Sequence, residues 1–167
     1  MYKRQDELYT PRSTLQATYE QIFADLDAAI ADLPGTAMSG KATKWAAHAL
    51  KSRAALYAAR IAKYHPQSSD GLTSIPAGLA GGYYTMSHAS ASAIIDSGKY
   101  PLHTGGGTYQ KTYSEVLTKK GNSEMIFVTE YDLGLGKTHM HGYFNMPDGF
   151  KSGWGSNTHI YESSVER

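Results

Sequence analysis

The stretch GKATKWAAHALKSRAALYAARIAKY, from Gly40 to Tyr64, contains nine alanines and no glycine after its first residue. Alanine has the highest helix propensity and a very small side chain, so the stretch predicts one long helix that its neighbours can approach closely. Its aromatic residues lie at helical spacings, and we expect Trp45, Tyr57 and Tyr64 to fill core volume along it. A helix of this kind needs partners on its small-residue face, which favours a helical fold.

A second helix is predicted just before it, over about residues 14–33. Ser13 or Thr14 can cap its start, and the proline and glycine of LPGT, residues 33–36, end it. The two helices predict a tightly packed hairpin. The apolar face of the earlier helix recurs at steps of three and four and consists of Leu15, Tyr19, Ile22, Leu26, Ala29 and Leu33.

The rest of the chain is predicted to contain two further helices, then a strand and long loops. After a loop that begins at Pro66, we expect a third helix over 83–97, with Gly98 as a left-handed cap, and a short fourth helix around 109–117. The segment EMIFVTEY, residues 124–131, predicts a strand, and glycine-rich, aromatic-rich loops follow it. The predicted fold class is therefore mostly α, with helical hairpins followed by one short strand and long irregular loops.

Composition excludes several classes of protein. The 167 residues carry a formal net charge of +1 with the two signs interspersed, so no nucleic acid partner is expected. The absence of cysteine excludes disulfides, thiolate nucleophiles and cysteine-ligated zinc. No apolar run approaches the roughly 20 residues of a membrane-spanning helix, and the N-terminus lacks the apolar core of a signal peptide.

Three patterns suggest nucleotide binding, metal binding or catalysis, but each lacks a residue or an arrangement that this chemistry requires. GLGKT, residues 134–138, would need a glycine at position 131 to cradle phosphates, and that position is Tyr131. His139 and His141 could begin a metal site, but they lack cysteines or the spacing H-E-x-x-H around them. Asp25 and Asp27 point to different sides of their helix, so we expect them to be solvated or to meet a neighbouring lysine. We therefore predict no catalytic residue, no cofactor and no metal.

Four sequence blocks, taken in order, are much more specific than any single motif. They are YEQIFADLDAAIADLP from Tyr19, GKATKWAAHALKSRAALYAA from Gly40, YYTMSHASASAIIDSGKYPL from Tyr83, and YQKTYSEVLTKKGNSEMIFVTEYD from Tyr109. This order resembles the SusD/RagB family, the glycan- and nutrient-binding outer-membrane lipoproteins of Bacteroidetes-type bacteria. The resemblance covers about residues 9–131 closely and the later loop faintly.

The resemblance implies a scaffold of tetratricopeptide-like hairpins that carries a ligand-binding surface of loops. It also implies a surface-exposed, non-enzymatic protein of the cell outer membrane, which packs as a lid on a SusC-type TonB-dependent transporter during nutrient uptake. Family members are several times longer and begin with a signal peptide and a lipidated cysteine, both missing here. We therefore interpret residues 1–5 as a non-native leader, 6–131 as scaffold and 132–167 as a loop-rich ligand-side region, truncated at its C-terminus and separated from its lipid anchor.

The loop region also has the residues that sugars require. Sugars present C–H faces to aromatic rings and hydroxyls to amides and carboxylates. The predicted ligand-binding residues, with His139 and His141 beside them, are Trp154, Tyr143, Phe144, Asn145, Asp148 and Asn157. An alternative is that the rings of Trp154 and Phe150 only pin the loop to the helices.

Two other functions stay open. A helical-repeat scaffold for protein–protein interaction would use the alanine-rich groove as its interface. An enzyme would need a carboxylate pair within the long loop.

Overall fold

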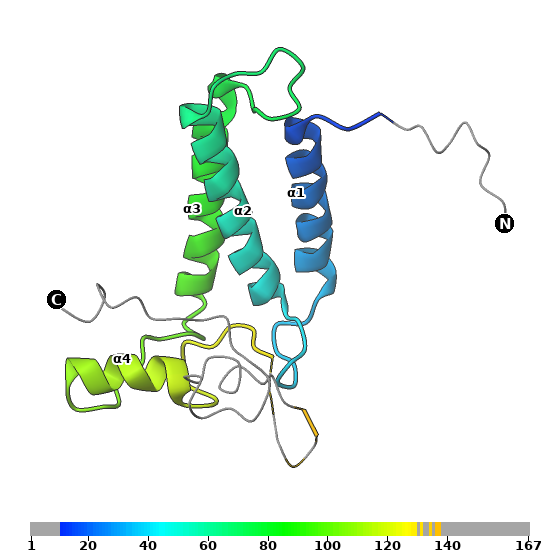
Figure 1. Cartoon of the computed structure of the whole chain (residues 1–167). Helices are drawn as coiled ribbons and strands as arrows, with labels where there is room; N and C mark the ends of the chain where they lie inside the picture. The colour runs from blue at the N-terminus through cyan, green and yellow to red at the C-terminus, as the bar shows by residue number, and fades with distance from the viewer. Residues whose placement is uncertain (1–10, 130, 132–133, 135, 138–167) are drawn as a thin grey trace, which may run out of the picture. The chain divides into compact units, whose positions relative to one another are not determined.

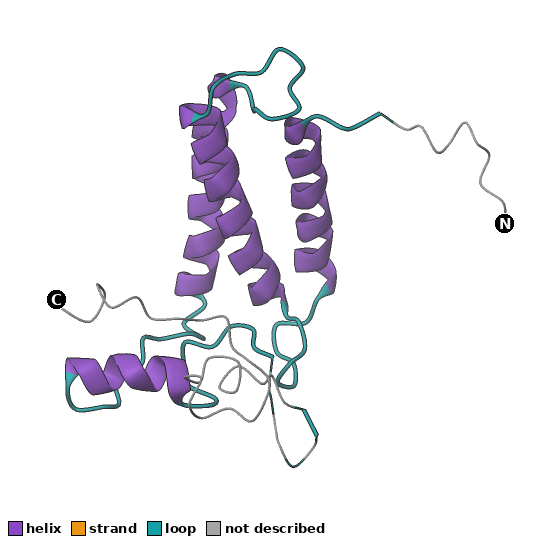
Figure 2. Cartoon of the chain, viewed as in Figure 1, coloured by secondary structure: helices purple, strands orange, loops and turns teal. Residues whose placement is uncertain are grey.

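The computed structural model describes residues 11–129, 131, 134, 136 and 137 (Figure 1). The chain divides into two units, 1–128 and 129–167, and all the described helices belong to the first. The mostly helical fold class is confirmed, as Figure 2 shows. In chain order the helices are α1 (Leu15–Asp32), α2 (Lys44–Tyr64), the short 3-10 helix η2 (Ala77–Leu79), α3 (Ala80–Asp96) and α4 (Tyr109–Thr118).

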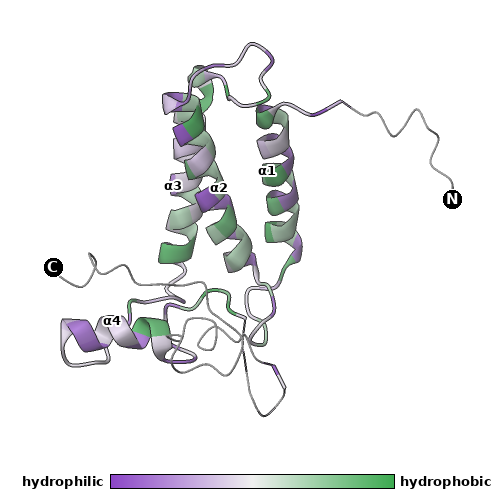
Figure 3. Ribbon diagram, in the orientation of Figure 1, coloured by the Kyte–Doolittle hydropathy of each residue, from purple (hydrophilic) through white to green (hydrophobic). Residues whose placement is uncertain are grey.

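The helices α1, α2 and α3 run antiparallel in sequence order, with α2 in the middle (Figure 1). The hydroxyl of Thr14 caps α1 by accepting a hydrogen bond from the Ala17 amide at 3.2 Å. Gly98 follows the end of α3 with φ of 64°, the left-handed conformation that the sequence predicts there. Hydrophilic residues gather on the side of α1 that faces away from α2 (Figure 3). None of the described helices combines the length and apolar character needed to cross a membrane.

The core is built from small residues on α2 and large ones around it. Four alanines of α2 are 0 to 1% exposed, namely Ala55, Ala58, Ala59 and Ala62. Phe23 of α1 and Tyr83 of α3 pack with them, and their ring centroids lie 5.5 Å apart. Since alanine side chains end at Cβ, the central helix admits both neighbours closely while the outer helices supply the volume. This arrangement agrees with the tight hairpin that the alanine-rich stretch predicts.

The large residues of α2 do not all lie where the sequence suggests. Tyr57 is 57% exposed and Tyr64 is 68% exposed, so the prediction that both belong to the core is wrong. Trp45 is half-buried. The reason is that α2 is covered on two sides, and both contacts use its alanines, which leaves its bulky residues on the remaining outer face.

Polar side chains join the helices at two positions. The hydroxyl of Ser52 on α2 donates to the Ser87 carbonyl at 3.0 Å, and the Ser87 hydroxyl on α3 donates to the Ser52 carbonyl at 2.8 Å. Such an exchange needs closely packed backbones, because a serine side chain is short. On the other side of α2, Lys51 pairs with Asp27 of α1, which confirms the expectation that Asp27 meets a lysine of the neighbouring helix.

The loop after α2 folds back onto one end of the helices. Its Ile75 is fully buried in the core, and the Gln67 side chain donates to the Ile75 carbonyl at 3.0 Å. The amide of Leu15, at the start of α1, donates to the Gly71 carbonyl at 3.0 Å. Gly71 has φ of 66°, a conformation that favours glycine. The loop therefore closes the core.

The strand predicted over 124–131 is wrong: its described residues, 124–129 and 131, form no strand. The high β propensity of Ile126, Phe127 and Val128 takes effect only when a neighbouring strand supplies hydrogen bonds. The segment begins instead in a turn around Asn122. The Glu124 amide donates to the Asn122 side-chain oxygen at 3.0 Å, and the Met125 amide donates to the Asn122 carbonyl at 3.3 Å.

Candidate functional site

The six predicted ligand-binding residues, Trp154, Tyr143, Phe144, Asn145, Asp148 and Asn157, lie outside the described residues, as do His139 and His141. Their assignment stays a prediction. Among the residues that the structure does describe, no group of three His, Asp or Glu side chains is placed to hold a metal ion. The described part of the chain offers a different candidate, at the start of α4.

The helix α4 stands apart from the other helices. Within the described helices it contacts none of α1, α2 and α3, and both hydrophobic and hydrophilic residues lie on its surface (Figure 3). Thr108 caps its first turn, since its hydroxyl accepts a hydrogen bond from the Lys111 amide at 3.3 Å. Three large side chains at steps of four are exposed, Tyr109 by 95%, Tyr113 by 70% and Leu117 by 68%.

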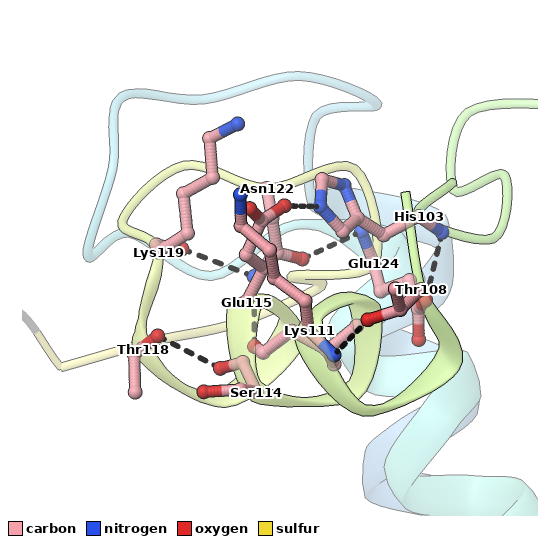
Figure 4. Close-up of polar contacts among 10 residues, drawn as sticks. His103, Thr108, Lys111, Ser114, Glu115, Thr118, Lys119, Asn122 and Glu124 are labelled. Atoms are coloured by element: carbon pink, nitrogen blue, oxygen red, sulfur yellow. Dashed lines mark hydrogen bonds and ion pairs between the residues drawn. The ribbon is translucent and has the colours of Figure 1, made fainter. Parts of the chain in front are cut away.

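Hydrogen bonds tie the chain before α4 to the helix and to the chain after it (Figure 4). The Nε2 of His103 lies 2.8 Å from the Glu115 carboxylate, and the His103 amide donates to the Glu124 carboxylate, also at 2.8 Å. The buried Asn122 side chain donates to the carbonyls of Val116 and Lys119, at 2.8 and 3.1 Å, at the end of the helix. These hydrogen bonds connect the segments before and after α4 to the helix and to each other.

The histidine also stabilises the ionised form of its partner. The hydrogen bond from His103 lowers the pKa of Glu115 below its ordinary value, and the positive charge of Lys119 acts in the same direction. Glu115 therefore stays ionised at neutral pH. An ionised carboxylate only accepts, so the His103 Nε2–H is the donor of this bond.

Two glycines allow the loop 105–107 to lie directly against α4. A Cβ at Gly106 would come 2.4 Å from the Thr112 backbone nitrogen, and one at Gly105 would come 2.8 Å from both the Glu115 carboxylate and the His103 ring. A side chain at Gly106 would collide with helix backbone, and one at Gly105 would displace the Glu115 and His103 side chains. The loop backbone thus packs on the first turns of the helix.

An open depression of about 700 Å³ lies where this loop meets α4. Its volume falls within the roughly 300–1,000 Å³ of typical ligand pockets. Among the described residues that line it there is no aspartate, glutamate, lysine or arginine. The lining residues are Leu102, His103, Thr104, Gly107, Thr108, Tyr109, Gln110 and Thr112. The surface combines one exposed ring with hydroxyls and an amide, which suits a neutral, hydroxyl-rich ligand better than a charged one.

A second aromatic cluster has a structural role. The Trp45 indole N–H donates to the Gly35 carbonyl at 2.9 Å, and the Lys99 ammonium donates to the same oxygen at 2.9 Å. The ammonium groups of Lys44 and Lys99 lie 4.8 and 5.7 Å from the centroid of the Trp45 ring, and the His48 ring stacks at 5.9 Å. The ring and its N–H are already engaged, so this cluster joins the ends of α1, α2 and α3 rather than offering a free surface.

The comparison with protein families identifies part of the chain. Residues 2–56 match a SusD-like family described as starch-binding and associating with the outer membrane. The match supports membership of the SusD/RagB family. It spans 55 residues, from 2 to 56, of the 167 in the chain, and it confirms the resemblance over α1 and the first part of α2. Comparisons with curated proteins and with solved structures gave no significant match.

The depression before α4 was not predicted from the sequence. Its signals are local: three successive glycines, a capping threonine and an aromatic residue at the first helical position, all in GGGTY from Gly105. The walls of the depression also depend on the bond between His103 and Glu124, which are 21 positions apart. No spacing rule indicates that bond.

Proposed function

We propose that this chain belongs to a non-catalytic binding protein that captures a glycan or another oligomeric nutrient at the bacterial outer membrane. The observation that carries the proposal is the match of residues 2–56 to the SusD-like family, because the family is described as starch-binding and outer-membrane associated. SusD-like proteins are binding proteins and not enzymes. Capture without turnover needs no cofactor and no metal.

The ligand side of the protein is the loop-rich region 132–167. It supplies rings for the C–H faces of sugars in Trp154, Tyr143 and Phe144. Amide and carboxylate groups for the sugar hydroxyls come from Asn145, Asp148 and Asn157. The affinity depends on how far the binding free energy of these contacts exceeds the free-energy cost of ordering a flexible ligand and the binding loops.

The partner and the location of the whole protein follow from the family resemblance. We propose that it is surface-exposed, is held by a lipid anchor outside this chain, and packs on a SusC-type TonB-dependent transporter. Co-purification of such a transporter from outer membranes with the tagged full-length protein tests this partnership. Recovery of the protein without any transporter would contradict it.

The binding function is tested by calorimetry with a starch-derived oligosaccharide, maltoheptaose, and a panel of other glycans. Trp154→Ala is expected to weaken binding by about 1 kcal/mol, the scale of a lost aromatic contact. Tyr64→Ala is the matched control, because Tyr64 is an exposed aromatic residue on α2, 68% accessible, and is outside the proposed ligand side. Absence of binding to every glycan would refute the proposal.

A second candidate function is favoured by the outer face of α2. Leu50, Tyr57 and Tyr64 are 54, 57 and 68% exposed, and their spacing by seven residues places them on one side of the helix. Exposed large apolar side chains in a row are typical of protein-interaction surfaces. A scaffold function predicts that Tyr57→Ser abolishes capture of a protein partner and leaves glycan binding unchanged.

A further inference from the structure

We infer that the depression before α4 is a second glycan subsite, which takes one end of a neutral oligosaccharide against the ring of Tyr109. The inference rests on the proposed function, because the ligand class comes from the family match. It adds a location that the loop residues 132–167 do not include. Four features of the described residues support it: an exposed ring, free polar groups, an uncharged lining and a fixed wall.

The ring of Tyr109 is the main contact. It is 95% exposed although it is a large aromatic side chain, and within the described part of the chain it stacks on no other ring. Its position at the start of a capped helix holds its Cα in place, and a tyrosine has only two side-chain torsions to order on binding. Covering this ring with the C–H face of a sugar removes apolar surface from water on both partners.

The polar side chains beside the ring suit sugar hydroxyls. Thr104 and Gln110 line the depression, and neither side chain forms a hydrogen bond within the described residues. An amide both donates and accepts, and a hydroxyl does the same, so together they can match a sugar hydroxyl in either direction. These groups lose water on binding and regain hydrogen bonds from the ligand.

The charge of the lining distinguishes between ligand classes. Among the described residues that line the depression there is no carboxylate, ammonium or guanidinium group, and the histidine among them already bonds to Glu115. On these lining side chains an anionic ligand such as a phosphate would find no cation, and a cationic ligand would find no carboxylate. A neutral oligosaccharide needs neither, so the lining is electrostatically complementary to it.

Contacts within the chain fix the wall of the depression, so it does not need a ligand to order it. The backbone of Gly106 is packed against Thr112, and the bonds of His103 to Glu115 and Glu124 fix the entry to the loop. A site that is already ordered loses less conformational entropy on binding than a mobile loop does. The subsite is therefore able to contribute affinity although it is shallow and open.

The test measures maltoheptaose binding to the full chain by calorimetry, together with amide chemical-shift mapping by NMR. Tyr109→Ala is expected to raise the Kd about fivefold, whereas Tyr109→Phe, which keeps the ring, stays within about twofold. Tyr113→Ala is the matched control: it removes an exposed tyrosine one turn along α4 that does not line the depression. Because Tyr109 is almost fully exposed, its loss leaves the unfolding midpoint unchanged.

The possible outcomes distinguish failure of the subsite from failure of the proposed glycan-binding function. A loss confined to Tyr109→Ala, with shift changes at Gln110 and Thr112, supports the subsite whatever the effect of Trp154→Ala. Binding that depends on Trp154 and is unchanged in Tyr109→Ala overturns the subsite and leaves the proposed function standing. Equal losses in Tyr109→Ala and Tyr113→Ala overturn it in favour of a general apolar docking face. Absence of binding by the unaltered chain to maltoheptaose and to every other glycan of the panel overturns both.

Discussion

Replacing Ala58 with leucine probes whether α2 is tightly enclosed by its neighbours. Ala58 is 0% exposed and belongs to the core cluster with Phe23 and Tyr83. If the space around it were loose, three added carbons would gain about 0.8 kcal/mol each from burial, or roughly 2 kcal/mol of stability. If the helices are in full contact, the same carbons force a backbone shift that costs about 1–3 kcal/mol. The two cases differ in sign, so the measurement decides between them.

We expect Ala58→Leu to be destabilised by about 1–3 kcal/mol, because the short side chain lets the backbones approach. The assay is urea unfolding followed by far-UV circular dichroism. Ala24→Leu is the matched control, since Ala24 is exposed on α1 and leucine has nearly the same helix propensity as alanine. The control is expected to stay within about 0.5 kcal/mol. A midpoint for Ala58→Leu equal to or above that of the unaltered chain would refute the close packing described here.

Three further substitutions test other parts of the structure. Phe23→Ala is expected to lose about 3–5 kcal/mol in urea unfolding, because a 5%-exposed ring is removed from the core; a loss under about 1 kcal/mol would place the core elsewhere. Gly106→Ala is expected to speed hydrogen exchange in residues 103–112, since its Cβ would lie 2.4 Å from the Thr112 nitrogen, while Gly81→Ala, whose Cβ meets nothing within 4 Å, leaves exchange there unchanged. Equal exchange in both variants would contradict the close contact. Burial, followed by the charges of two nearby lysines, lowers the pKa of His48 below its ordinary value of 6.5, so the fold favours the neutral ring and loses stability as the pH falls below 6.5. His48→Gln should therefore flatten the fall in unfolding midpoint on the acid side, and an unchanged pH profile would show that His48 does not cause it.

Local patterns in the sequence predict the helices well, because their causes are local. The predicted span 14–33 agrees with α1 at Leu15–Asp32, since the cap at Thr14 and the proline and glycine after Leu33 act within one turn. The same holds for Gly98 at the end of α3. The order of sequence blocks also indicates the SusD/RagB resemblance, which the family match supports over residues 2–56.

The errors concern properties that depend on distant neighbours. The buried face of α2 consists of alanines, and a pattern of large apolar residues therefore predicts the wrong face, as Tyr57 and Tyr64 show. The segment 124–129 has the composition of a strand but no partner strand among the described residues. The depression before α4 requires His103 to meet Glu124 and Gly106 to touch Thr112, and neither contact is encoded by spacing.

The isolation of α4 from the other described helices has an evolutionary consequence. A substitution at Tyr109 or Gln110 changes exposed side chains that no core residue contacts, so its effect on folding is small. A substitution at Ala58 or Ala59 changes the packing of three helices at once. The same chain therefore contains positions where a substitution has little effect on folding and positions where a substitution disturbs the core. The proposed subsite can therefore change its side chains without a prior gain in stability.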